Sequence, residues 1–155
     1  MTEDFLPIVL REVDADAPEI GLIYSGWLQS LRNNPFFGMV PEQMYFTHYR
    51  PQVGRILATS KILLACNPDE PDQIFGFVVY RFIGDIPHIS YAYTKGTWRR
   101  QRVADRLVNH VLSEQPAGES GGMVSHMMPW LLAPSKNRGL IFNPFKDLEL
   151  LNEKD

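Results

Sequence analysis

The chain has 155 residues, of which 45% are hydrophobic and 21% are charged, and its formal net charge is −3. This composition is typical of one globular domain, and the acidic balance argues against bulk binding to nucleic acid. No apolar run reaches the length of about 18 residues that crosses a membrane, and the N-terminus lacks the basic start of a signal peptide. Cys66 is the single cysteine, which fits a reducing cytoplasm. We expect a single domain over residues 1–155, with 147–155 as an acidic tail.

Apolar residues at alternating or helical spacing predict the elements of the first half of the chain. In order they are a strand over 7–13, a helix over 18–31, a loop over 33–38, a second helix over 41–57 and a strand over 61–66. Pro51 is expected to kink or split the second helix, because proline removes an internal hydrogen bond. Gly21 and Gly26 weaken the first helix without abolishing it.

The second half of the chain begins with a turn over 67–72. The elements expected after it are a strand over 73–82, a hairpin turn at Gly84 and Asp85, a strand over 88–94, a helix from near Trp98, a connection over 115–122, a strand over 123–128, a short helix over 129–136 and a last strand over 140–145. Three consecutive strands should pair antiparallel, and a strand–helix–strand crossover follows. The predicted class is therefore α+β, with a mixed, mostly antiparallel twisted sheet of about six strands flanked by about four helices.

Residues 91–108 are the most informative stretch, because a strand ends there, a short basic loop follows and an amphipathic helix begins. Such a junction exposes main-chain N–H groups and a helix N-terminus, which bind phosphate. The guanidinium groups of Arg99, Arg100, Arg102 and Arg106 favour the same ligand. A solvated basic turn, or a patch that contacts an acidic protein, is the alternative interpretation.

Five stretches of the chain, together with the order of the elements, resemble a known family. The stretches are 24–32, 64–76, 91–95, 124–126 and 139–145. They resemble the GNAT acyltransferase superfamily and, more narrowly, the small GNAT-like proteins encoded by bacteriophages and prophages. The resemblance covers most of the chain, from residue 8 to residue 146.

The resemblance implies an acyl-CoA site in a V-shaped splay between the fourth and fifth strands. In the superfamily the pantetheine arm pairs with the fourth strand, and the loop pattern Arg/Gln-x-x-Gly-x-Gly/Ala holds the pyrophosphate. That pattern falls on residues 99–104, where Arg99 and Ala104 match and Arg102 replaces the first glycine. The cofactor implied is acetyl-CoA or another acyl-CoA. Its expected contacts are Tyr93, Thr94, Arg99, Arg100, Gln101, Arg102, Val103, Ala104 and Asn137.

The catalytic groups that the superfamily often uses are missing from their usual places. The fourth strand has no carboxylate between Pro87 and Thr94, and the short helix over 129–136 has no tyrosine. His126 is the candidate base, because neutral imidazole suits proton transfer near pH 7, and a structural histidine is the alternative. Tyr93 is the second catalytic candidate; it either lines the cleft or packs in the core.

The loop before the second helix borders the acceptor site in this family. Phe36, Phe37 and His48 are therefore candidates for a substrate or partner rim. The alternatives are a loop packed on the core and an exposed histidine. The histidines and the cysteine lack metal-ligand spacing, so no metal is expected.

Two functions follow from these residues, and a third from the resemblance alone. The first is a phage-encoded N-acyltransferase that moves an acyl group from acyl-CoA to an amine, with a host protein as one candidate acceptor. The second is a catalytically degenerate GNAT-fold module that binds a host protein in the host cytoplasm. The third is a minor virion component. One scaffold hosts many functions, so the fold does not decide among them.

Overall fold

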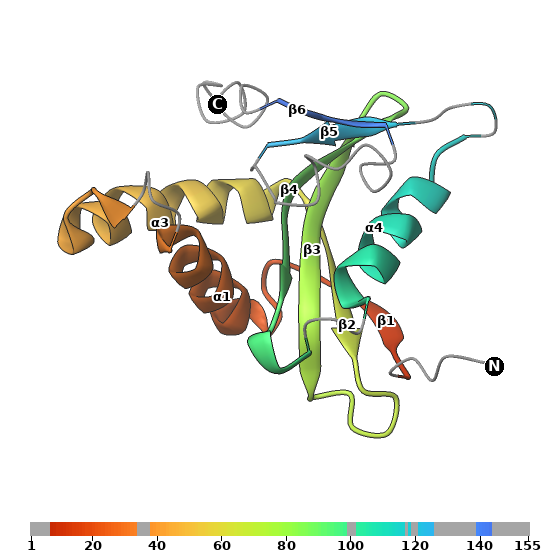
Figure 1. Ribbon diagram of the computed structural model, residues 1–155, viewed down its shortest axis with the longest axis horizontal. Helices are drawn as coiled ribbons and strands as arrows, with labels where there is room; N and C mark the ends of the chain where they lie inside the picture. The colour runs from red at the N-terminus through yellow and green to blue at the C-terminus, as the bar shows by residue number, and fades with distance from the viewer. Residues whose placement is uncertain are drawn as a thin grey trace.

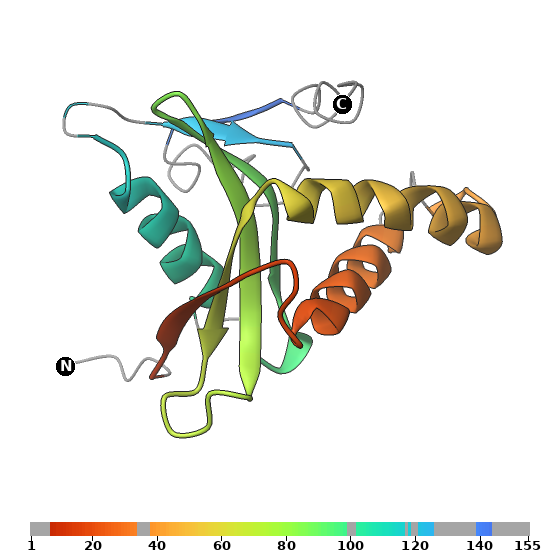
Figure 2. The same ribbon diagram turned by 180° about the vertical axis from the view of Figure 1, so that it is seen from behind.

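The computed structural model describes residues 7–33, 38–98, 102–116, 118, 121–125 and 139–143. One twisted sheet lies between two helical layers, with α1 and α3 on one face and α4 on the other (Figures 1 and 2). In chain order the elements are β1 (Val9–Val13), α1 (Ile20–Arg32), α3 (Glu42–Ala58), β2 (Lys61–Cys66), β3 (Ile74–Ile83), β4 (Ile86–Thr94), the 3-10 turn η1 (Gly96–Trp98), α4 (Val103–Ser113), β5 (Gly122–Val124) and β6 (Leu140–Phe142).

The strands lie in the sheet in the order in which they occur in the chain. Pairing is antiparallel from β1 to β4, and it is parallel between β4 and β5 and between β5 and β6. The hairpin between β3 and β4 turns at Gly84, whose φ of 63° suits a residue without a Cβ. This architecture confirms the predicted α+β class and its mixed sheet.

Alternation along the central strands builds a separate core on each face of the sheet. On β2, Ile62 and Leu64 pack against α1 and α3, whereas Leu63 and Ala65 pack against α4. Cys66 ends β2 fully buried in the first core, and burial raises the pKa of its thiol above the ordinary value. In the described part of the chain no helix is long and apolar enough to cross a membrane.

Two predictions about helices differ from the structure. The second helix continues through Pro51, so the alternative in which Pro51 splits it is wrong. Pro51 is exposed, and buried Tyr45 and Val53 on either side of it anchor the helix to the core. The last described helix starts at Val103 rather than near Trp98, because Trp98 lies in η1 with its ring 4.4 Å from that of Phe75. The helix predicted over 129–136 and the tail over 147–155 lie outside the described residues.

The pairing of β3 with β4 contains an extra residue on β4. Val79 lies opposite Tyr91 and Tyr80 opposite Ile89, so Ser90 is the extra residue of β4. This is a β-bulge, and it reverses the alternation of side chains. Ile89 packs in the α4 core and Tyr91 in the α1 and α3 core, although they are two residues apart.

Candidate functional site

The described pairing of β4 with β5 reaches as far as the bulge. His88 and Ile89 pair with Met123 and Val124, and Ser125 makes the last described contact. Its N–H donates to the carbonyl of Ile89 at 3.0 Å, and its hydroxyl donates to the carbonyl of Ser90 at 3.2 Å. β4 continues to Thr94, and among the described residues no strand pairs with it there except β3. The described ladder thus covers half of β4, between the two strands where the splay is predicted.

Main-chain groups beyond the bulge point in alternating directions, and one contact fixes which residues point outward. The N–H of Lys95 donates to the carbonyl of Phe75 at 2.9 Å, so these two residues form a hydrogen-bonded pair. Two positions back, Tyr93 and Phe77 form the next such pair. The N–H and C=O groups of Ala92 and Thr94 consequently point away from β3, along the edge beside β5.

Thr94 also carries a polar side-chain group at this edge. Its hydroxyl oxygen is buried and has no hydrogen-bond partner among the described residues. Buried hydroxyls are normally paired, so an orphan one marks a place where a ligand or water completes the contact. Gly76 lies opposite, where a Cβ would fall on the Tyr93 carbonyl oxygen and 3.1 Å from Val103 Cγ1. The glycine lets β3, β4 and the start of α4 come this close together.

Tyr91 and Tyr93 share the face of β4 that packs against α1. The hydroxyls of Tyr91 and Ser30 share a hydrogen bond, and the Tyr91 ring meets Trp27 edge-on at 5.1 Å. The ring of Tyr93 lies 5.4 Å from that of Phe77. Tyr93 is only partly buried, so it lines the edge of this core.

The helix–strand contact beside Tyr93 depends on Gly26. A Cβ at that position would lie 3.0 Å from Tyr93 Cε1 and 3.2 Å from Phe77 Cε2. The glycine that the sequence marks as a weak point of α1 is thus the point where α1 approaches the sheet. Tyr45 supports the same layer by donating its hydroxyl to the carbonyl of Leu28 at 2.6 Å. Burial raises the pKa of Tyr45 to about 12, so it stays a donor.

Arg102 is the N-cap residue of α4 and has a left-handed backbone, with φ 58° and ψ 28°. It is the one non-glycine residue of the described chain with positive φ. A left-handed backbone favours glycine, which is the residue that the motif has here. Arg102 therefore has the backbone conformation that suits the motif glycine, together with an exposed arginine side chain. Val103 begins α4 and is buried, and Ala104 follows it in the first turn.

The structure brings five of the predicted site residues to one end of the sheet, namely Tyr93, Thr94, Arg102, Val103 and Ala104. His48 is exposed on α3. The other predicted site residues lie outside the described residues; they are Phe36, Phe37, Arg99, Arg100, Gln101, His126 and Asn137. Sequence reasoning missed the structural roles of Ser90 and Gly76, because a bulge and a close strand contact leave no periodic signal. The described part of the chain contains no group of three residues that could hold a metal ion.

Comparison with solved structures finds the same architecture in acetyltransferases. A putative acetyltransferase from Deinococcus radiodurans R1 is 20% identical, with a TM-score of 0.51, and the match covers 100% of this chain and 89% of that one. YjaB from Escherichia coli is 24% identical, with a TM-score of 0.51, over 71% of this chain and 67% of its own. The glucosamine N-acetyltransferase region of a fungal β-N-acetylglucosaminidase is 12% identical, with a TM-score of 0.50, over 69% of this chain and 12% of that multidomain one.

These likenesses identify the fold. The chain has the α+β fold of the GNAT acetyltransferases. No protein-family model matches the sequence, and no curated protein sequence matches it either. The activity must therefore be argued from the residues of the site.

Proposed function

We propose that this protein is an N-acyltransferase that moves an acyl group from acyl-CoA to an amine. The observation that carries the proposal is that the described β4–β5 contacts reach only as far as Ser90, so the outward main-chain groups of Ala92 and Thr94 lie beyond the described pairing. An extended amide chain such as pantetheine can pair with such an edge as an added strand does. The likeness to acetyltransferase structures supports the proposal.

The residues at this end of the sheet fit an acyl-CoA. Ala92 and Thr94 would hold its pantetheine arm, and the main-chain N–H groups at the start of α4 would hold its diphosphate. The exposed Arg102 side chain adds a guanidinium group that suits phosphate. When bound, acyl-CoA supplies a thioester, which is an activated acyl donor. The protein's part is to hold this donor against β4 and to direct the acyl group toward the face that carries Tyr93.

Two finer parts of the proposal rest on the resemblance of short stretches to phage proteins. We propose that the protein is phage-encoded and that its acceptor amine belongs to a host protein in the host cytoplasm. His126 remains the proposed base, with Phe36, Phe37 and His48 at the acceptor rim. Modification of a host lysate with labelled acetyl-CoA tests the acceptor, because a labelled host protein would appear only when the enzyme is present.

The test of cofactor binding is calorimetric titration of acetyl-CoA into the full chain. Thr94→Val should weaken binding by about threefold to tenfold, the value of one hydrogen bond. Thr97→Val is the matched control, because Thr97 is exposed in η1. Arg102→Gly should bind acetyl-CoA at least as tightly as Arg102→Ala, because glycine keeps the left-handed backbone and clears the amides. Absence of binding at millimolar acetyl-CoA, in both the wild-type protein and Arg102→Gly, contradicts the proposal.

One observation favours a second candidate, a GNAT-fold module that binds a host protein without catalysis. Arg102 occupies the glycine position of the motif, and β4 has no Asp or Glu. A stable host partner whose binding is unaffected by acetyl-CoA, together with no acyl transfer, would favour this module. The third candidate, a minor virion component, requires that the protein be found in purified particles by mass spectrometry.

A further inference from the structure

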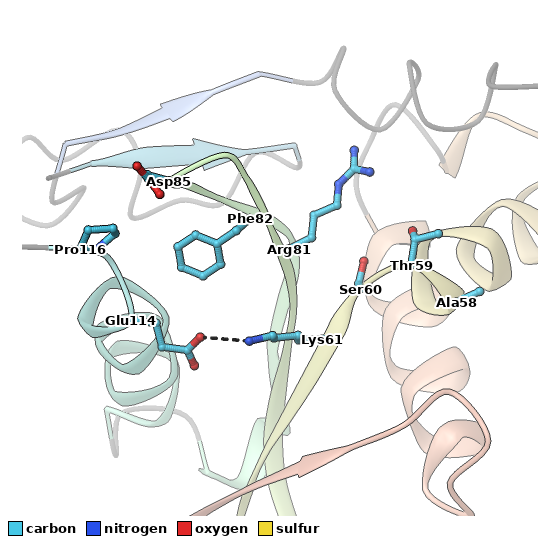
Figure 3. Close-up of a pocket in the computed structure, with 9 residues that line it drawn as sticks. All are labelled: Ala58, Thr59, Ser60, Lys61, Arg81, Phe82, Asp85, Glu114 and Pro116. Atoms are coloured by element: carbon cyan, nitrogen blue, oxygen red, sulfur yellow. Dashed lines mark ion pairs between the residues drawn. The ribbon is translucent and has the colours of Figure 1, made fainter.

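A cavity of about 690 Å³ lies at the end of the sheet opposite the candidate acyl-CoA site. Asp85 lines the cavity and lies in the turn just before β4, whereas Thr94 lies at the far end of β4. The cavity extends from the end of α3 across the start of β2 to the end of α4 (Figure 3). It therefore belongs to another part of the fold and has no role in the proposed acyl transfer.

Strand alternation divides the residues that line this cavity. Arg81 and Phe82 are neighbours on β3, so they point to opposite faces of the sheet. Figure 3 shows Arg81 directed away from Phe82 and Asp85. Phe82 belongs to the α4 face, where its ring lies 6.3 Å from that of Tyr80. Lys61 comes from β2 and reaches toward Glu114 on this same face (Figure 3).

Glu114, which caps the end of α4, presents a carboxylate that the protein already orients. Its Oε1 accepts a hydrogen bond from the buried Tyr80 hydroxyl at 2.7 Å and lies 3.3 Å from His110 Nε2. Burial and this carboxylate raise the pKa of Tyr80 above its ordinary value, so the hydroxyl stays a donor. Its Oε2 lies 3.6 Å from Lys61 Nζ. That distance is longer than a charge-assisted hydrogen bond of about 2.7–2.9 Å, so Oε2 can accept a closer donor.

The α4 side of the cavity carries two carboxylates, those of Asp85 and Glu114. Among the described residues that line this side, Lys61 is the cation, and half of its side chain is exposed, so it can swing into solvent. With Lys61 turned outward, the charge that remains on this side is negative. The C-terminal end of α4 adds the negative end of its helix dipole.

We propose that the α4 side of this cavity, formed by Lys61, Phe82, Asp85 and Glu114, is a binding site for an aliphatic ammonium ion. One ammonium group binds Glu114 Oε2 in place of Lys61. The hydrocarbon chain lies on the Phe82 ring, and the face of this ring also attracts the adjoining ammonium group. Asp85 binds a second ammonium group, so a short diamine fits better than a monoamine. The site is a further one that acyl transfer does not require.

The test uses the full chain and putrescine, a four-carbon diamine, as the probe. Its addition should shift the amide resonances of Lys61, Phe82, Asp85 and Glu114 in a saturable way. Glu114→Gln should weaken binding by about tenfold or more, because it removes the anchored charge but keeps an acceptor for Tyr80. Asp85→Asn should weaken it by about threefold. The matched control is Asp69→Asn, an exposed carboxylate in the β2–β3 turn, which should leave putrescine affinity unchanged.

Lys61→Met tests whether the site binds cations or anions. Removal of the competing ammonium group should tighten putrescine binding, whereas a site for anions would lose its ligand. The proposal is overturned if inorganic phosphate binds the wild-type protein here and Lys61→Met abolishes that binding. It is also overturned if n-butanol binds as tightly as putrescine. If Glu114→Gln does not fold, Asp85→Asn and Lys61→Met decide. Unchanged putrescine affinity in both of these variants overturns the proposal.

Discussion

The two halves of β4 differ in almost every respect, although they belong to one strand. Before Ser90 the strand lies between β3 and β5, and His88 and Ile89 are fully buried. After Ser90 no described residue of β5 pairs with the strand, and Tyr93 and Thr94 are only partly buried. One extra residue separates a strand segment that holds the sheet together from one whose edge suits a ligand.

The comparison shows how a bulge can serve two purposes at once. It lies where the described contacts with β5 stop, and it puts Tyr91 and Tyr93 on the face covered by α1. Regular alternation over the same residues would instead put Tyr91 on the side of Ile89, facing α4. Stability and the proposed binding edge thus come from the same strand because its register changes in the middle.

Deletion of Ser90 should have the largest effect. Without it, Ile89 and Tyr91 become neighbours that still lie opposite Tyr80 and Val79, so each keeps its face of the sheet, but β4 loses the bulge and the carbonyl that the Ser125 hydroxyl contacts. We expect the free energy of unfolding to fall by about 2–3 kcal/mol, measured by urea denaturation followed by circular dichroism. Ser90→Ala keeps the residue count and the carbonyl that Ser125 contacts, and it should fold with a change of about 1 kcal/mol or less. A deletion variant of wild-type stability would show that the bulge is dispensable.

Gly76→Ala should destabilise the second half of β4. The new Cβ meets the Tyr93 carbonyl and Val103 Cγ1, and such overpacking costs about 1–3 kcal/mol. Urea denaturation gives the free energy of unfolding. Gly96→Ala is the control, because a Cβ there meets nothing within 4 Å. Equal stabilities of the two variants would mean that β3 and β4 are less tightly held than their contacts indicate.

Ser125→Ala tests the last described contact between Ser125 and β4. It removes the hydrogen bond to the Ser90 carbonyl, and we expect a loss of about 0.5–1.5 kcal/mol. Hydrogen exchange should show faster exchange of the Ser125 amide in the variant. The exposed Ser25→Ala in α1 should change stability by about 0.5 kcal/mol or less. An unchanged exchange rate at Ser125 would argue that the hydroxyl does not hold β5.

The smallest expected changes in stability come from two glycines of α1, which form a closely matched pair. Gly21→Ala meets nothing within 4 Å and should stabilise the protein by about 0.5–1 kcal/mol. Gly26→Ala has the same gain in helix propensity, but it pushes on the rings of Tyr93 and Phe77. It should therefore lose that gain and shift the ring resonances of Tyr93. Equal gains in both variants would place Tyr93 farther from α1 than the structure does.

Periodicity of apolar residues was sufficient to predict the order of the elements and the sheet class. It could not reveal the bulge, because Ile89 and Tyr91 are both apolar and either face accepts them. It also misjudged Pro51, since buried residues on both sides of the proline keep α3 in one piece. The motif placed Arg102 at the start of a helix, but its left-handed backbone is set by the fold around it. The anchored Glu114 joins β3 to the end of α4, a long-range contact that no local pattern reveals.

Burial of Cys66 makes the protein's one thiol a reporter of local opening. The side chain is fully buried at the end of β2, and its raised pKa keeps it as an unreactive thiol. A thiol reagent can reach it only when β1 or the α1 layer moves away from β2. Its labelling rate in native buffer should therefore measure the free energy of that opening, with no probe introduced into the chain.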